Sequence, residues 1–264
     1  MPELPDVAAF KSYFDVTALH QRIEDVEVQG IYPLKEIAPD ELREGLRGRA
    51  FESTERHGKY LFVALDGDGG WLVLHFGMTG DLKYYKVPEK EPEYDQVLLR
   101  FANGYHLAYV SKRKLGEVRL IDDVDAFIEE HDLGPDAMAE DFDYERFKET
   151  FGRKGGMVKS ALMDQSTLAG IGNVYSDEIL FQAGIHPQRK VQDLDEQELR
   201  RVYESLKEVL ETAIEHNAEP ADFPADYLIP HRGEERCPCC DGELQSVKVS
   251  GRTGYYCPER QPEP

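Results

Sequence analysis

The feature that most constrains the fold is a pair of apolar runs joined by a glycine-rich turn. Residues 60–78, YLFVALDGDGGWLVLHFGM, place two β-rich runs on either side of DGDGG, and aspartate and glycine at such a junction favour a tight turn between antiparallel strands. Residues 96–110 repeat the pattern around an Asn-Gly dipeptide. We therefore expect residues 23–120 to form the strands of a β-sandwich or flattened barrel, preceded by a helix at about residues 7–19.

The second half of the chain has helical periodicity. Residues 195–217 form the clearest helix pattern, because apolar side chains recur at every third or fourth position. Asp195 followed by Glu198 is a capping-box signal at the start of this helix. Residues 143–151 predict a shorter helix, and the chain from residue 236 returns to short strands around cysteines. A strand-rich half followed by a helical half predicts an α+β protein.

The composition is that of a globular protein long enough for two modest domains. The chain has 264 residues, of which 41% are hydrophobic. No apolar run approaches the length that spans a bilayer, and the acidic N-terminus lacks the apolar core of a signal peptide. We therefore expect a cytoplasmic protein that does not associate with membranes.

The charge of the chain is strongly acidic but uneven. The formal net charge is −21, and phosphates repel an acidic surface, which argues against nonspecific binding of nucleic acid. Residues 120–143 carry ten acidic residues and no lysine or arginine, whereas residues 111–119 and 152–159 are basic. Local patches rather than the total charge decide binding, so the two basic stretches leave nucleic acid open as a partner, and we hypothesise that the acidic total reflects a salt-rich cytoplasm.

The first residues, MPELPDV, allow two interpretations of Pro2. It can belong to an extended lead-in to the first helix, with Pro5 near the first turn, where the missing N–H of proline costs nothing. Alternatively, a methionine before a small residue is normally trimmed, and removal of Met1 would leave Pro2 as a free secondary amine. These residues alone favour the first interpretation.

Residues 162–187, LMDQSTLAGIGNVYSDEILFQAGIHP, predict two helical pieces around a loop with Gly170, Gly172 and Asn173. Glycine in such a loop permits tight turns and the close approach of another backbone. Residues 176–178, Ser-Asp-Glu, mark the start of the second helix, where free N–H groups can hold a phosphate. A plain connector between core helices is the alternative, and the spacing alone favours it.

This segment resembles the helix–two-turn–helix of the formamidopyrimidine-DNA glycosylase and endonuclease VIII family. Other motifs of that family follow in order along the chain: PELPDV from residue 2, HGKYLF from 57, HFGMTGDL from 75, LGPDAM from 133 and GRTGYYCP from 251. The resemblance therefore covers nearly the whole chain, and it reverses the preference between the two interpretations of Pro2.

The resemblance implies a base-excision-repair enzyme, a DNA glycosylase with associated AP lyase activity. Its partner would be damaged double-stranded DNA, bound between domains by a monomer that associates with the nucleoid through DNA. The implied domains are a catalytic β-sandwich with its N-terminal helix at residues 1–121, a helix–two-turn–helix domain at 122–230 and a zinc-finger-like hairpin at 231–264. The alternative is a noncatalytic damaged-DNA-binding protein of the same fold.

Four positions match the catalytic residues of the family. Pro2 matches the amine that attacks C1′ of the damaged nucleotide, and an α-amino group, with a pKa of about 8, is neutral more often at pH 7 than a lysine. Glu3 matches the residue that moves protons to the sugar and the leaving base. Lys59 matches a proton donor in β-elimination, and Arg252 matches the finger arginine that grips phosphates and assists δ-elimination.

Six further positions match the DNA contacts of the family: Asn173 and Lys154 with phosphates, Arg113 with the base opposite the lesion, and Met78, Leu115 and Tyr94. Met78 matches a side chain that fills the space left by a flipped nucleotide. Leu115 stands where the family has an aromatic wedge, and Tyr94 stands where it has a histidine. Leucine can still intercalate between bases, but it stacks less.

The four cysteines, Cys237, Cys239, Cys240 and Cys257, lie together near the end of the chain, which suggests a metal site rather than a disulfide framework. The family holds Zn²⁺ with two Cys-x2-Cys pairs. Here Cys237 and Cys240 form the first pair and Cys257 begins the second, but Arg260 stands at the fourth position. A three-thiolate zinc site completed by water or another group is one alternative, and a metal-free hairpin is the other.

Overall fold

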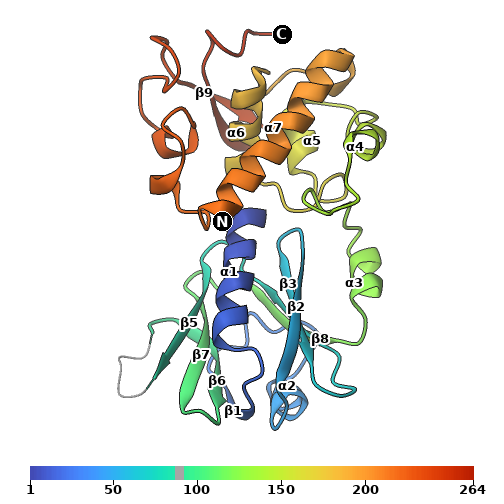
Figure 1. The fold of residues 1–264 in the computed structure, drawn as a ribbon, viewed down its shortest axis with the longest axis vertical. Coiled ribbons are helices and arrows are strands. Elements are labelled where there is room, and N and C mark those ends of the chain that lie inside the picture. Colours follow the sequence, from blue (N-terminus) through green and yellow to red (C-terminus); the bar gives the residue numbers. More distant parts are fainter. Residues whose placement is uncertain (87–91) are drawn as a thin grey trace. The chain divides into compact units, whose positions relative to one another are not determined.

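The computed structural model describes residues 1–86 and 92–264, which form two compact units (Figure 1). The N-terminal unit comprises Met1–Pro2 and Asp6–His131, and the C-terminal unit comprises Glu3–Pro5 and Asp132–Pro264. The expected division into three domains at residues 121 and 230 stays a prediction. Within the described ranges, no helix is both long and apolar enough to cross a membrane.

The N-terminal unit is built on a β-sandwich, as the hairpin patterns predict. Over the described residues, its strands pair antiparallel in two sheets with the orders β1-β6-β7-β5 and β2-β3-β4-β8. The strands are β1 (Ile23–Val28), β2 (Phe51–His57), β3 (Tyr60–Leu65), β4 (Trp71–His75), β5 (Gly80–Lys86), β6 (Asp95–Phe101), β7 (Tyr105–Ser111) and β8 (Glu117–Ile121). The DGDGG turn joins β3 to β4 and the Asn-Gly turn joins β6 to β7, so both predicted hairpins are confirmed.

Helix α1 (Leu4–Thr17) supplies aromatic side chains to the core of this unit. The rings of Phe14 on α1 and Phe51 on β2 meet edge to face at 5.0 Å between centroids, and Phe10 lies 4.2 Å from Phe76. Phe14 and Phe51 are fully buried among the leucines and valines of both sheets. Removal of this apolar surface from water holds the helix against the sheets.

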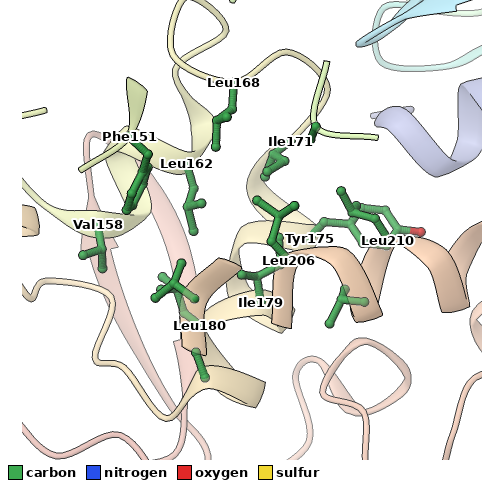
Figure 2. Close-up of a cluster of buried hydrophobic side chains, with 14 of the residues drawn as sticks. Phe151, Val158, Leu162, Leu168, Ile171, Tyr175, Ile179, Leu180, Leu206 and Leu210 are labelled. Carbon is green, nitrogen blue, oxygen red and sulfur yellow. The ribbon is translucent and has the colours of Figure 1, made fainter. Parts of the chain in front are cut away.

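The C-terminal unit is helical and ends in a β-hairpin. Its elements are α4 (Tyr144–Thr150), α5 (Val158–Met163), α6 (Asn173–Ala183), α7 (Glu196–Glu215), β9 (Gln245–Val249) and β10 (Arg252–Tyr256), with 3-10 turns at Val191–Asp193, Pro220–Asp222 and Ile229–His231. Asp195 caps α7, and Glu198 completes the predicted capping box. Apolar side chains of α5, α6 and α7 form one buried cluster, which Figure 2 shows.

Local predictions of element boundaries differ from the structure at three places. α1 begins at Leu4 rather than at residue 7, because a proline in the first turn does not interrupt a helix. α2 (Pro39–Leu46) lies within the region expected to form strands, and its two buried leucines, Leu42 and Leu46, give too weak a periodic signal to predict a helix. α6 begins at Asn173 rather than at Ser176.

α3 (Val124–Glu130) is a short helix in the acidic stretch.

Candidate active site

The carboxylate of Glu3 is held by the start of helix α6. The backbone N–H groups of Gly172 and Tyr175 donate to its Oε2 at 2.6 and 3.2 Å, and that of Val174 donates to Oε1 at 2.9 Å. The first N–H groups of a helix have no partner within the helix, and the helix dipole favours an anion at this end. Glu3, which is only 2% exposed, satisfies these donors in place of a capping side chain.

Two glycines make room for this contact. A Cβ at Gly172 would lie 2.4 Å from Glu3 Cδ, and a Cβ at Gly170, where φ is +111°, would lie 2.6 Å from Leu4 Cδ1. The Leu4 N–H also donates to Gly170 O at 2.9 Å. The glycines of the loop therefore permit the close approach of another backbone, as their residue type predicts.

The prediction of where α6 begins is wrong. Gly172 is the N-cap of the helix, and Ser176, Asp177 and Glu178 are fully buried within it rather than at its start. The N–H groups that were candidates for binding a phosphate bind the carboxylate of Glu3 instead. The reason is tertiary, because the carboxylate comes from 169 residues away in the chain and no local pattern specifies it.

A buried charge network lies within the first two turns of α6. Lys159 of α5 and Asp177 of α6 are both 0% exposed, and Lys159 Nζ lies 2.5 Å from Asp177 Oδ1. Lys159 Nζ also donates to Asn173 O at 3.0 Å and to Ser176 Oγ at 2.8 Å, and Arg232 pairs with the second carboxylate oxygen of Asp177. Burial lowers the pKa of Lys159, and the charge of Asp177 opposes that shift. Such dense hydrogen bonding is what a buried ion pair requires.

The same part of α6 holds the C-terminal hairpin. Asn173 Nδ2 donates to Thr253 O at 3.1 Å, and the Tyr255 N–H donates to Asp177 Oδ2 at 3.2 Å. Gly254 lets β10 come this close, because a Cβ there would lie 2.9 Å from Asp177 Oδ1. The side chain of Asn173, a predicted phosphate contact, therefore also joins the helix to the hairpin.

Arg252 lies at the start of β10 and is exposed, with its Nη1 3.3 Å from Met163 Sδ. Because the first two turns of α6 hold both β10 and the carboxylate of Glu3, they position two of the predicted catalytic side chains within one unit. Lys154, another predicted DNA contact, is at the surface of this unit, and its Nζ lies 3.4 Å from Asp164 Oδ2.

Lys59 and His75 lie close together in the N-terminal unit. Lys59 is in the turn between β2 and β3 and is 7% exposed. His75, at the end of β4, pairs with Tyr60 across the sheet, and burial together with the charge of Lys59 lowers the pKa of His75 to about 4. Perturbed groups of this kind cluster at functional sites. The sequence reasoning missed His75, although this residue begins the HFGMTGDL motif. Pro2 is half-buried and belongs to the same unit as Lys59 and His75.

Two loops of the N-terminal unit bring Met78, Arg113 and Leu115 together. The Arg113 N–H donates to Thr79 Oγ1 at 3.0 Å. Gly77 adopts a φ of +55°, and a Cβ there would lie 2.4 Å from Leu115 O, so only glycine lets these loops touch. Met78 and Leu115 are 40% and 53% exposed, which is unusual for large apolar side chains and suits residues that insert into a duplex.

Two exposed tyrosines lie beside these loops. Tyr94 O accepts from the Ser111 N–H at 3.0 Å, and Lys112 Nζ lies 5.7 Å from the centre of the Tyr94 ring. Tyr32 is 63% exposed and lies 4.7 Å below Lys114 Nζ. The sequence reasoning missed Tyr32, because the exposure of the apolar pair at residues 31–32 is visible only in the structure. Aromatic rings under lysines are suited to contact a nucleic-acid strand.

A role for both basic stretches in binding DNA is only partly compatible with the structure. Arg119 is buried and pairs with Glu117 at 2.6 Å and with Glu36 at 2.9 Å, and Lys159 is the buried partner of Asp177. The cations at residues 112–114 and 153 are exposed, and Lys154 is half-buried. Charge patterns along a sequence do not reveal which cations are needed inside the fold.

Three cysteines of the hairpin region form a cluster suited to a metal ion. The Sγ atoms of Cys237, Cys240 and Cys257 all lie within 4.8 Å of one another. Backbone N–H groups donate to each sulfur: that of Cys239 to Cys237, that of Gly242 to Cys240, and those of residues 259 and 260 to Cys257. These donors favour thiolates, the form that binds zinc, whereas burial and the hydrogen bonds with Cys237 and Cys240 raise the pKa of Cys257 to about 12. The thiol of Cys239 instead donates to Asp226 O at 3.1 Å.

Comparison with known proteins agrees with this geometry. The sequence profile of the formamidopyrimidine-DNA glycosylase N-terminal domain matches residues 1–118, and that of its H2TH domain matches residues 133–224. A formamidopyrimidine-DNA glycosylase of Heliobacterium modesticaldum is 33% identical over 281 residues, which cover 99% of this chain and 100% of the relative.

Solved structures are similar over the same length. The complex of Lactococcus lactis Fpg with DNA containing an abasic site has a TM-score of 0.89 at 27% identity, and it covers 99% of this chain and 100% of that one. The complex of the same enzyme with DNA containing N7-benzyl-Fapy-dG has a TM-score of 0.90, with the same identity and coverage.

The β-sandwich, the helix–two-turn–helix around Gly170 and Gly172 and the cysteine-bearing hairpin define the fold of helix–two-turn–helix DNA-repair proteins. Within that class, the chain belongs to the formamidopyrimidine-DNA glycosylase family.

Proposed function

We propose that this chain is a DNA glycosylase that removes oxidised or ring-opened bases from double-stranded DNA and then cleaves the strand as an AP lyase. The relatives carry the glycosylase name, and the solved neighbours are complexes with DNA that contains a modified base or an abasic site. The observation that carries the proposal is the Glu3 carboxylate, which three N–H groups of residues 172–175 hold directly beside Pro2 in the chain.

Pro2 supplies the nucleophile in this proposal. Removal of Met1 exposes its secondary amine, which attacks C1′ of the damaged nucleotide as the bond to the base breaks. The amine then loses its proton, and the C1′–O4′ bond breaks as O4′ takes up a proton, which leaves an iminium ion with no N–H to lose. When a proton leaves C2′, the iminium accepts the C–H electron pair as an enamine. The same pair then forms the C2′–C3′ double bond as the 3′ phosphate departs. Glu3 moves protons at the sugar and at the leaving base.

Lys59 and Arg252 serve the strand-cleavage steps. Lys59 donates a proton during β-elimination, and His75, which stays neutral at pH 7 because its pKa is about 4, adds no second cation beside Lys59. Arg252, exposed at the start of β10, binds phosphates next to the lesion and assists δ-elimination. A fixed cation near a departing phosphate stabilises the charge that develops on it.

Duplex binding uses side chains of both units, of which Lys154 and Asn173 are only partly exposed. Those of the N-terminal unit are Met78, Tyr94, Arg113 and Leu115, and those of the C-terminal unit are Lys154 and Asn173. Met78 fills the space left by the flipped nucleotide, and Leu115 intercalates between bases. The cations neutralise phosphates, which makes binding depend on salt.

We also propose that Cys237, Cys240 and Cys257 hold Zn²⁺. The clustered sulfurs and their N–H donors support this assignment. A bound ion would add folding free energy to the hairpin that carries Arg252. The hairpin is also supported by packing, because Tyr256 and Cys257 are buried.

Borohydride trapping on DNA with an abasic site tests the function. The protein with Met1 removed should become covalently attached through Pro2, and N-terminal mass analysis should confirm the trimming. Pro2→Gly should lose most of the adduct, and protein that retains Met1 should form none. Pro5→Ala is the matched control and should trap normally.

Two results would contradict the proposal. An adduct that maps to an internal lysine would refute the role of Pro2. Tight binding to lesion duplexes without trapping or base release would favour a noncatalytic damaged-DNA-binding protein instead.

A further inference from the structure

The cysteine cluster offers three sulfur ligands, whereas structural zinc is almost always held by four groups. Arg260 occupies the position expected for the fourth ligand, and a guanidinium has no lone pair to give to a metal. Its charged end lies 4.9 Å from the centre of the Phe181 ring, where a cation–π contact holds it. The fourth ligand must therefore come from another group.

The side chain of Glu259 lies near the sulfurs. A Cβ at Gly242 would lie 2.8 Å from Glu259 Cγ, 3.2 Å from Cys257 Sγ and 3.3 Å from Cys240 Sγ. The Glu259 side chain and two of the sulfurs thus surround one point, which the absence of a side chain at Gly242 leaves open. Glu259 is also exposed, so rotation about its side-chain bonds is not restricted by packing.

We infer that Glu259 supplies the fourth ligand of a zinc site made by Cys237, Cys240 and Cys257. The inference rests on the proposed zinc site. In the structure the carboxylate oxygens of Glu259 lie outside the 4.8 Å cluster of sulfurs, so ligation requires its side chain to rotate toward them. Glutamate oxygen is an accepted ligand of zinc beside cysteine sulfur.

The charges near the cluster agree with this ligand set. Three thiolates and Zn²⁺ carry a net charge of about −1, and a carboxylate makes this −2, the same as four thiolates around the ion. The positive charge of Arg260 acts on the sulfur of Cys240. The arginine that replaces the expected cysteine therefore offsets part of the negative charge of the site.

Zinc affinity of the full chain, measured by competition with a chromogenic chelator, tests the inference without reference to activity. The unaltered protein should retain about one zinc per chain, and Glu259→Gln should weaken zinc binding by roughly 10-fold or more. Glu243→Gln, an exposed glutamate before β9 in the same region, is the matched control and should bind as tightly as the unaltered protein.

A second variant separates ligation from a general structural effect. Arg260→Cys restores a fourth thiolate, and in that background Glu259→Gln should change the zinc affinity little. Cobalt substitution should show a stronger thiolate-to-metal absorption band in Arg260→Cys than in the unaltered protein, because the band grows with the number of bound thiolates.

Three outcomes would overturn the inference. In the first, the unaltered protein holds no zinc although Arg260→Cys does. In the second, Glu259→Gln binds zinc as tightly as the unaltered protein. In the third, Glu259→Gln weakens zinc binding as much in the Arg260→Cys background as it does alone. None of them bears on borohydride trapping through Pro2, so failure here is distinguishable from failure of the proposed function.

Discussion

The Glu3 carboxylate and the backbone N–H of Gly172 form a 2.6 Å hydrogen bond across 169 residues of sequence. This contact places a candidate catalytic carboxylate at the positive end of an 11-residue helix, α6. It depends on residue 172 having no side chain, because a Cβ there would lie 2.4 Å from Glu3 Cδ.

Gly172→Ala should therefore displace Glu3 without removing its carboxylate. The backbone at residue 172, with φ of −130°, is accessible to alanine. We expect single-turnover base excision to fall by about 10- to 100-fold, because small misplacements of catalytic groups have effects of that size. Gly155→Ala adds a methyl group where no atom lies within 4 Å and should excise normally. Unchanged excision in Gly172→Ala would remove the link between this contact and catalysis.

Lys154 and Lys159 should have separable roles although they lie only five positions apart in the sequence. Lys159→Met leaves Asp177 buried beside Arg232 alone, and we expect the free energy of unfolding of the C-terminal unit to fall by about 3–5 kcal/mol. Lys154→Met should leave that free energy nearly unchanged, because the Lys154–Asp164 pair is exposed.

The same two variants should differ in DNA binding. Lys154→Met should lower the slope of log affinity against log salt concentration by about 1, as expected when one phosphate contact is lost. Denaturation followed by circular dichroism gives the stability of each variant, and titrations at several salt concentrations give the slope. A large loss of stability in Lys154→Met would contradict the assignment.

Leu115→Ala should weaken binding to a duplex with an abasic-site analogue. The side chain is 53% exposed, so its truncation should cost little stability, while the loss of apolar contact with the bases should lower affinity by about 10-fold. Val16→Ala, on α1 and 82% exposed, is the matched control. Equal affinity of the two variants, measured by fluorescence anisotropy, would show that Leu115 does not enter the duplex.

Glu178 should make the stability of the C-terminal unit fall as pH rises. Burial raises the pKa of Glu178 to about 7 from its ordinary 4.5, against the effect of hydrogen bonds from Gln182 and from the Leu228 and Ile229 N–H groups. Between these two pKa values the folded state binds more protons than the unfolded state, so the free energy of unfolding decreases with pH. The decrease should be on the order of 3 kcal/mol.

Glu178→Gln has no proton to lose and should remove this slope between pH 5 and pH 7.5. Denaturant titrations of both proteins across that range measure the slope of unfolding free energy against pH. The comparison cancels the contributions of other groups, such as His75, whose lowered pKa makes stability rise between about pH 4 and pH 6.5. The same slope in both proteins would show that Glu178 does not titrate in this range.

Much of the fold could be predicted because its signals are local. The turn after β3 and the capping box of Asp195 and Glu198 arise from dihedral preferences and from hydrogen bonds between close neighbours. The residue type of Gly170 and Gly172 predicted a close approach of another backbone, because glycine has no side chain to prevent it. The eight residues of α2 were not predicted, since a short segment with two buried leucines has almost no periodic signal.

The candidate site was predicted mainly from motif resemblance, and the relations among its residues were not predicted. HFGMTGDL was recognised, but the neutral state of His75 depends on burial and on the charge of Lys59, which lies in another segment. Cys237, Cys240 and Cys257 indicated a metal site, while the nearness of Glu259 to the sulfurs depends on how the chain folds around Gly242.

By itself, then, the sequence determined where strands turn, where α7 is capped and which positions must lack a side chain, because each of these depends on neighbours a few residues away. Only the tertiary structure decided that the N–H groups at the start of α6 bind Glu3 rather than a phosphate, and that Lys159 is buried while the side chain of Lys154 is 40% exposed. Two lysines in one basic stretch have the same local chemistry. Their difference arises because Asp177 faces one of them in the folded interior, where an unpaired charge is costly.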